Sequence, residues 1–248
     1  MNVVEAPSPN FDSRTAPPGV LVLHYTGMKT GQEALDRLRD PAAKVSSHYL
    51  VEEDGRVFRL VAEERRAWHA GASYWRGRRN LNGESIGIEI VNPGFTDTPA
   101  GRIWYAYPQP QIDAVIALVR KIVKEHEIKP DRILGHSDIA PGRKVDPGPR
   151  FPWQQLADAG LITWPDAAMV AIKKAAFEQQ LPDVAWFQQK LNAHGFAVPL
   201  HGEFDQRTQD VVSAFQMKYR QARFDGVPDA ETAALLEVLT APSDAKTK

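Results

Sequence analysis

The chain contains no cysteine among its 248 residues. This absence excludes disulfides, thiolate metal ligands and cysteine nucleophiles, and it leaves the redox compartment undecided. A metal site in this protein therefore has to be built from histidine and carboxylate side chains.

The chain also has almost no net charge and no long apolar run. The chain has 30 Lys and Arg against 31 Asp and Glu, a formal net charge of −1, which argues against a nucleic-acid partner held by bulk electrostatics. No apolar run approaches the roughly 20 residues that cross a bilayer, so we expect no transmembrane segment. The start, MNVVEAPSPNFDSR, lacks the pattern of a signal peptide. We expect a cytoplasmic protein if Met1 is the native start, and a periplasmic or outer-membrane-associated one if a leader was removed.

Residues 1–160 predict an α/β domain, with a mixed central sheet flanked by helices. Short runs rich in β-branched residues predict strands, and helical spacing of apolar residues predicts helices. The predicted strands are residues 20–23, 45–51, 56–60, 85–91 and 132–135, and the predicted helices are residues 31–39 and 109–127. A hairpin turn is expected at Asp54-Gly55.

The composition changes after residue 160. Two Trp/Leu-Pro steps predict a connector over residues 161–182, carrying one short helix. Helical patterns then follow at residues 183–194, 205–220 and 229–239, with Asp205 and Asp229 as N-caps. They predict a smaller three-helix domain over residues 183–240, near the lower size limit for independent folding. We expect a disordered tail at 241–248 and a monomeric protein.

The segment GHSDIAPGRKVDPGP, residues 135–149, combines metal-ligating and cationic side chains in a loop rich in Gly and Pro. His136 and Asp146 are suitable zinc ligands, and Lys144 can stabilise negative charge that develops during a reaction. A third ligand has to come from elsewhere. By residue type and position, it could be His24 at the end of a predicted strand, His48 or His69.

Glu89 lies between Ile88 and Ile90 in an apolar strand, where an unpaired carboxylate would be costly to bury. One interpretation is an outward-facing position on an edge strand. The other is a general base with a raised pKa that faces the metal.

Together these residues resemble the zinc-dependent N-acetylmuramoyl-L-alanine amidases of the amidase-2 type, which share a fold with peptidoglycan-recognition proteins. The matching segments run in the family's order over residues 7–160: LVLHYTG, VSSHYLVEEDG, RAWHAG, LNGESIGIEIVN and GHSDIAPGRKVDPGPRFPWQQLA. The C-terminal segment VVSAFQMKY is similar to three-helix peptidoglycan-binding domains. The resemblance thus implies hydrolysis of the amide between N-acetylmuramic acid, or its 1,6-anhydro form, and L-alanine of the stem peptide.

The resemblance also implies residue roles. It makes His24 the third ligand of one catalytic Zn²⁺, beside His136 and Asp146. It makes Glu89 the catalytic acid/base and Lys144 the stabiliser of the transition state. Some members carry a tyrosine just before the position of His48, whereas this chain has Ser47, which favours Glu89 as the base. The remaining candidates are expected to line a groove for peptidoglycan or muropeptide: His48, His69, Trp68 and Arg76, with Trp75 either in the groove or in the core.

Two other functions fit the same residues. One is a non-catalytic peptidoglycan receptor that has lost its metal, although every ligand position here holds a competent residue. The other is a zinc peptidase that cuts within the stem peptide.

Overall fold

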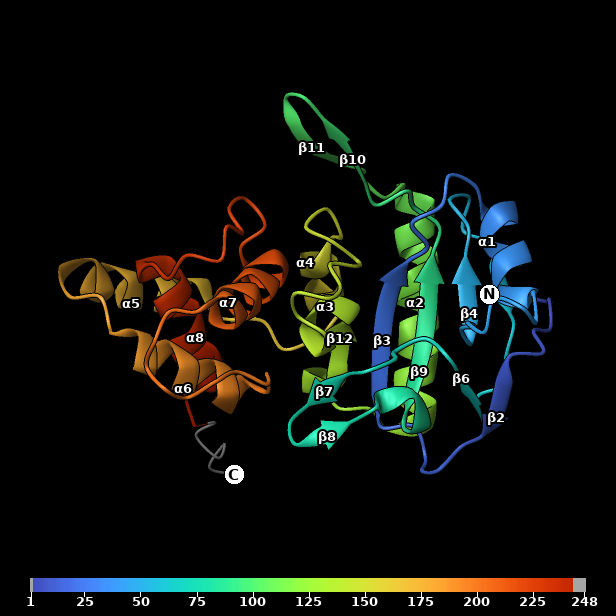
Figure 1. The fold of residues 1–248 in the computed structure, drawn as a ribbon, viewed down its shortest axis with the longest axis horizontal. Coiled ribbons are helices and arrows are strands. Elements are labelled where there is room, and N and C mark those ends of the chain that lie inside the picture. The colour runs from blue at the N-terminus through green and yellow to red at the C-terminus, as the bar shows by residue number, and fades with distance from the viewer. Residues whose placement is uncertain (1, 243–248) are drawn as a thin grey trace.

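The computed structural model describes residues 2–242, and most of the tail predicted at 241–248 lies outside them. A six-stranded mixed sheet forms the centre of the N-terminal part of these residues (Figure 1), as the sequence predicts. Its strand order is β1 (Val3–Glu5), β5 (Val57–Arg59), β4 (Tyr49–Val51), β9 (Ser85–Ile90), β3 (Val20–Tyr25) and β12 (Ile133–Gly135). The strands β4, β9, β3 and β12 run parallel, and β5 is antiparallel to β4. The carboxyl ends of the four parallel strands therefore meet at one edge.

Alternation along β3 and β9 separates the two faces of the sheet. Leu21 and Leu23 of β3, with Ile86, Ile88 and Ile90 of β9, pack against the apolar stripe of α2 (Gln109–His126). The intervening residues of both strands point to the other face. His24 and Glu89 belong to this second set, so strand periodicity alone places both on the face away from α2.

Shorter elements surround the sheet. Helix α1 (Gly31–Arg39) packs near β4 and is capped by Thr30, whose hydroxyl accepts from the Glu33 N–H. The hairpin formed by β10 (Phe95–Thr98) and β11 (Gly101–Trp104) projects away from the body of the protein (Figure 1). The other elements are β2 (Phe11–Ser13), β6 (Arg65–Ala67), β7 (Tyr74–Trp75), β8 (Arg78–Arg79), α3 (His136–Ile139), α4 (Trp153–Asp158) and the 3₁₀ turns Leu81–Gly83 and Pro130–Arg132.

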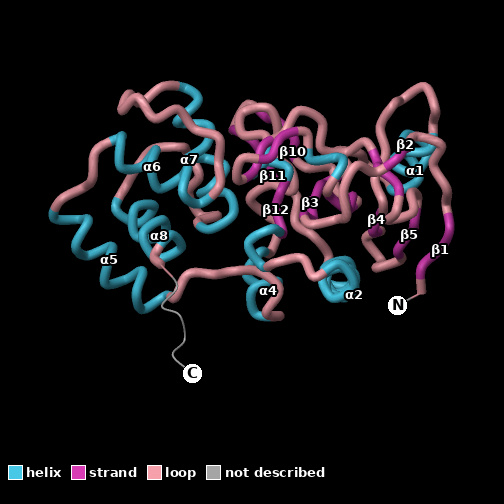
Figure 2. Tube along the Cα trace, turned by 90° about the horizontal axis from the view of Figure 1, so that it is seen from below, coloured by secondary structure: helices cyan, strands magenta, loops and turns pink. Residues whose placement is uncertain are grey.

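The C-terminal part contains α5 (Ala167–Gln179), α6 (Val184–His194), α7 (Gln206–Tyr219) and α8 (Ala230–Thr240). The last three agree with the predicted helices, and Asp205 and Asp229 cap α7 and α8 as expected. The connector was predicted to carry one short helix, and residues 167–179 form a longer helix of 13 residues that packs along α8 (Figure 2). Asp166 starts this helix by accepting from the Met169 N–H at 2.8 Å.

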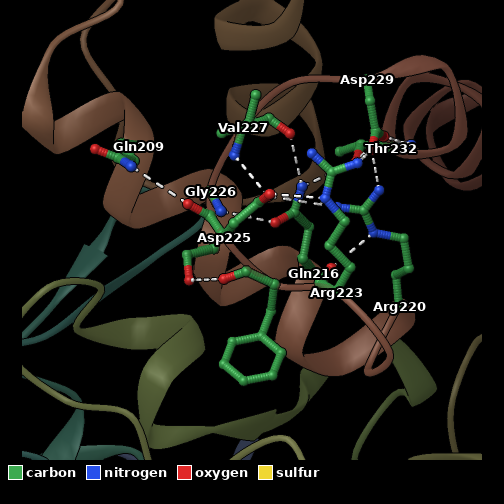
Figure 3. Close-up of polar contacts among 11 residues, drawn as sticks. Gln209, Gln216, Arg220, Arg223, Asp225, Gly226, Val227, Asp229 and Thr232 are labelled. Atoms are coloured by element: carbon green, nitrogen blue, oxygen red, sulfur yellow. Dashed lines mark hydrogen bonds and ion pairs between the residues drawn. The ribbon is translucent and has the colours of Figure 1, made fainter. Parts of the chain in front are cut away.

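The loop between α7 and α8 is held by Gln216, which is fully buried. Its amide nitrogen donates to Val227 O and Thr232 Oγ1, each at 3.0 Å, and its amide oxygen accepts from the Gly226 N–H (Figure 3). Asp229 accepts from the Thr232 N–H at 2.9 Å. These bonds tie the loop to α7 and to the first turn of α8.

The sheet domain and the C-terminal helical domain share one hydrophobic core cluster. A single apolar cluster includes Val22 and Leu134 of the sheet together with Phe187 and Phe215 of the C-terminal helices. Trp75 belongs to the same cluster and is 3% exposed, so it is a core residue at the domain boundary.

A buried ion pair also crosses this boundary. Lys218 of α7 donates to Ile133 O and to Asp138 Oδ2, each at 3.0 Å, and its ammonium lies 4.3 Å from the ring centroid of Trp153. Lys218 therefore contacts β12 before the segment 135–149, α3 within it and α4 after it. Within residues 2–242, no helix is both long and apolar enough to cross a membrane.

Candidate metal centre

Four of the predicted site residues meet at the edge where the parallel strands end. His24 lies near the end of β3 and is the register partner of Glu89 on β9. His136 is the first residue of α3, directly after β12, and Asp146 follows in the same Gly- and Pro-rich segment. The fold thus brings together two strands and one loop that are far apart in the sequence.

His24, His136 and Asp146 form a compact and buried donor set. His24 Nδ1 lies 2.9 Å from both His136 Nδ1 and Asp146 Oδ2, and His136 Nδ1 lies 3.0 Å from the same carboxylate oxygen. The three residues are at most 6% exposed. Atoms this close can all contact one cation. The structure therefore selects His24 as the partner of His136 and Asp146 from the three histidines that the residue types left open.

The protonation of these groups suits a metal. His136 Nε2 lies 3.1 Å from Ala70 O, a carbonyl acceptor, so the tautomer with its proton on Nε2 would donate there and leave the Nδ1 lone pair free for a metal. Burial, followed by repulsion from His136, lowers the pKa of His24 to about 4, so its ring is neutral at pH 7. Burial alone would raise the pKa of Asp146, but the two histidines lower it below its usual range and keep it ionised.

Glu89 faces the same site without a partner. Its Oε2 is enclosed, and among the described residues it has no hydrogen-bond partner. Burial, with a further contribution from Asp146, raises the pKa of Glu89 well above 4.5. This agrees with the interpretation as a general base rather than with an outward-facing residue on an edge strand, because β9 is an inner strand of the sheet.

A cavity of about 420 Å³ opens in front of these groups. His24, Glu89, His136, Lys144 and Asp146 line it, and Lys144 is half-buried there. Two imidazoles and one carboxylate form a donor set that suits a catalytic zinc ion, with the cavity side left free for water or substrate. The residues present therefore fit the metal that the resemblance implies.

Of the residues predicted to line the groove, Trp68 and His69 lie in the cavity wall. His48 is fully buried behind it, where its Nδ1 accepts from the Gly87 N–H. Arg76 lies at the domain boundary, where it donates to His194 O and pairs with Asp131. The structure thus does not bring His48 or Arg76 to the cavity.

Sequence reasoning also missed cavity residues, among them Arg143. Its guanidinium donates to Ala70 O and Ala72 O, at 2.9 and 2.7 Å, and so ties segment 70–72 to the metal-bearing segment. The sequence signal that could have identified Arg143 is its position next to Lys144. Tyr25 and Arg37 also line the cavity.

A mixed sheet whose parallel strands end at two histidines, an aspartate and a neighbouring glutamate is an arrangement suited to a metal-dependent hydrolase. A family model described as N-acetylmuramoyl-L-alanine amidase matches residues 14–149, more than half of the chain. The chain belongs to this N-acetylmuramoyl-L-alanine amidase family. A second model, for a peptidoglycan binding domain, matches residues 180–236.

Several characterised relatives cover much of the chain. N-acetylmuramoyl-L-alanine amidase AmiD of Escherichia coli (strain K12) is 42% identical over 229 residues, 89% of this chain and 81% of the relative. The 1,6-anhydro-N-acetylmuramyl-L-alanine amidase AmpD of the same organism is 36% identical over 169 residues, 60% of this chain and 87% of the relative.

Two solved structures have the same fold over nearly the whole chain. The first is E. coli AmiD in complex with the substrate anhydro-N-acetylmuramic acid-L-Ala-D-gamma-Glu-L-Lys, with 39% identity, a TM-score of 0.82 and coverage of 92% of this chain and 91% of that one. The second is AmpDh3 from Pseudomonas aeruginosa in complex with anhydromuramic pentapeptide, with 38% identity, the same TM-score and coverage of 89% and 90%.

Proposed function

We propose that this protein is a zinc-dependent N-acetylmuramoyl-L-alanine amidase that releases the stem peptide from N-acetylmuramic acid or its 1,6-anhydro form. The observation that carries the proposal is the buried triangle of His24, His136 and Asp146, which lines one cavity with Glu89, the register partner of His24. The family match and the two relatives in complex with anhydromuramyl peptides support the choice of substrate.

His24, His136 and Asp146 hold the zinc ion in this proposal. When bound there, zinc supplies Lewis-acid chemistry, which polarises a carbonyl and acidifies water. The surrounding residues perform the remaining steps of the hydrolysis.

Glu89 is the general base and then the general acid. Its carboxylate takes a proton from the attacking water as the new C–O bond forms at the lactyl carbonyl. It then delivers this proton to the nitrogen of L-alanine as the C–N bond breaks, which leaves a carboxylic acid and a free amine. Such proton transfer typically contributes about 10²–10⁴-fold to the rate. The ammonium of Lys144 donates to the carbonyl oxygen, where negative charge develops.

Mass spectrometry of digested muropeptides tests the proposal. The zinc-loaded full chain is incubated with intact sacculi and, separately, with 1,6-anhydro-muropeptides, with the Glu89→Gln variant as the matched control. Free peptide that begins with L-alanine supports the amidase. A cut within the peptide supports the peptidase alternative, and a loaded protein that binds muropeptide without any product supports the receptor alternative. The relative rates on the two substrates decide between wall and recycled fragments.

The C-terminal domain is proposed to bind the peptidoglycan wall, in agreement with its family match. Sedimentation with insoluble sacculi measures this directly. We further propose that the protein acts as a monomer, which light scattering after size-exclusion chromatography tests, and cell fractionation decides between the cytoplasmic and the envelope locations.

A further inference from the structure

We propose that His69, supported by Ser85, is a positioning residue that holds the ligand His24 in the tautomer with a free Nδ1. His24 Nε2 lies 3.0 Å from His69 Nδ1, and His69 Nε2 lies 3.1 Å from Ser85 Oγ. This inference rests on the zinc site of the proposed function. His69 lines the cavity wall, as the sequence predicted, and the inference adds a role for it in orienting a metal ligand.

The direction of each hydrogen bond follows from the last acceptor in the series, the carbonyl oxygen of Leu81. Ser85 Oγ lies 2.7 Å from Leu81 O, and a carbonyl oxygen can only accept, so the Ser85 hydroxyl proton points there. Ser85 Oγ then accepts from His69 Nε2–H. A neutral imidazole carries one N–H, so His69 Nδ1 is an acceptor and receives the Nε2–H of His24. The Nδ1 of His24 is left with its lone pair toward Asp146 and His136.

The missing side chain of Gly87 on β9 leaves the space that the His69 ring occupies. A Cβ added at Gly87 of β9 would lie 2.6 Å from Cγ and Nδ1 of the His69 ring. The ring therefore lies directly against the strand backbone, between Ser85 and Glu89, which share its face of β9. Any side chain at position 87 would displace the ring.

The main chain around His69 is fixed as well. Asn82 Oδ1 accepts from the N–H groups of His69 and Ala70, at 3.1 and 2.7 Å. Ala70 O in turn accepts from His136 Nε2–H at 3.1 Å. Two consecutive residues thus orient both histidine ligands, His69 through its ring and Ala70 through its carbonyl. Outer partners of this kind typically contribute about 10–100-fold to metal affinity.

Zinc affinity of the full chain, measured by competition with a chromophoric chelator, tests the inference. His69→Leu removes the acceptor and should raise the zinc Kd about 10–100-fold. His69→Asn places an amide oxygen near the former Nδ1 and should recover much of the loss. The visible spectrum of the Co²⁺-loaded protein should change in His69→Leu, because it reports on ligand geometry.

Ser85→Ala and Ser47→Ala form a matched pair. Both serines are fully buried, and both hydroxyls donate to a main-chain carbonyl at 2.7 Å, but only Ser85 of the two also lies within hydrogen-bond distance of His69, whereas Ser47 bonds to Gly87 O. Ser85→Ala should weaken zinc binding in the same direction as His69→Leu, by roughly tenfold or less, whereas Ser47→Ala should leave it at the wild-type value.

Each outcome decides a separate question. A wild-type chain that binds no zinc would contradict the proposed function itself. A wild-type chain that binds zinc, with a folded His69→Leu variant of equal affinity and unchanged Co²⁺ spectrum, would overturn the positioning role. If His69→Leu does not fold, the serine pair decides, because equal zinc affinity in Ser85→Ala and Ser47→Ala would equally overturn it.

Discussion

Replacement of Lys218 by methionine removes the ammonium that crosses the domain boundary while keeping a long apolar side chain. Lys218 is 5% exposed and its partner Asp138 is 2% exposed. After the substitution, the Asp138 carboxylate keeps the Gly135 N–H at 2.9 Å but loses its ion pair, and Ile133 O loses a donor. The variant therefore leaves a buried charge without its counter-charge.

The size of the effect follows from this burial. Removal of one partner from a buried ion pair typically lowers the free energy of unfolding by about 3–5 kcal/mol. For a chain of this length, each 1 kcal/mol shifts Tm by roughly 2–4 °C, so we expect a loss on the order of 6–20 °C. Because the domains share an apolar cluster, we expect them to unfold in one transition in the wild type.

Scanning calorimetry and urea denaturation measure the change. Lys190→Met is the matched control, because Lys190 pairs with Glu237 inside the C-terminal domain and both side chains are more exposed. Such a more exposed ion pair contributes about 0–1 kcal/mol to the free energy of unfolding. The double variant Lys218→Met, Asp138→Asn should recover part of the loss, since the buried carboxylate is no longer charged. A Lys218→Met variant that loses no more stability than Lys190→Met would refute the reasoning.

Three further variants test the site and the interior. Glu89→Gln should keep its full metal content while kcat falls about 10²–10⁴-fold; turnover near the wild-type rate would remove Glu89 from the base role. Lys144→Met should lower kcat about 10²–10³-fold with little change in KM, and a change confined to KM would contradict charge stabilisation. Burial, and then Lys218 and Arg76, lower the pKa of His194 from 6.5 to about 3, so the unfolded chain binds a proton that the folded chain excludes between these values. Stability should fall as the pH drops below about 6.5, by up to about 1.4 kcal/mol per pH unit for this group. In His194→Phe this fall should be shallower, and equal slopes in urea titrations of the two proteins would exclude the effect.

The sequence predicted those parts of the fold that depend on local patterns. The period-two alternation around Glu89, the Asp54-Gly55 turn and the long apolar stripe of residues 109–126 all depend on near neighbours, and the structure has a strand, a hairpin and a helix there. The local density of His136, Lys144 and Asp146 likewise marked one half of the site.

Contacts between distant segments could not be predicted in this way. Residue type alone did not separate His24 from His48 and His69, because the choice depends on the pairing of β3 with β12, which brings His24 beside His136. The bond between Lys218 and Asp138 joins residues 80 positions apart. The length of helix α5 was underestimated, because Pro165 and Pro182 were interpreted as marks of a connector with one short helix, whereas Asp166 was an N-cap signal.

The register of His24 opposite Glu89 has a consequence for the divergence of such enzymes. Both side chains rise from adjacent strands at the same level of the sheet, so their spacing is set by main-chain hydrogen bonds and not by any loop. Replacements in α1, whose Arg37 lines the cavity, leave that spacing untouched. Under the proposed function, selection could therefore reshape a wall of the cavity, while the pair proposed to ligate the metal and move the proton stays in place.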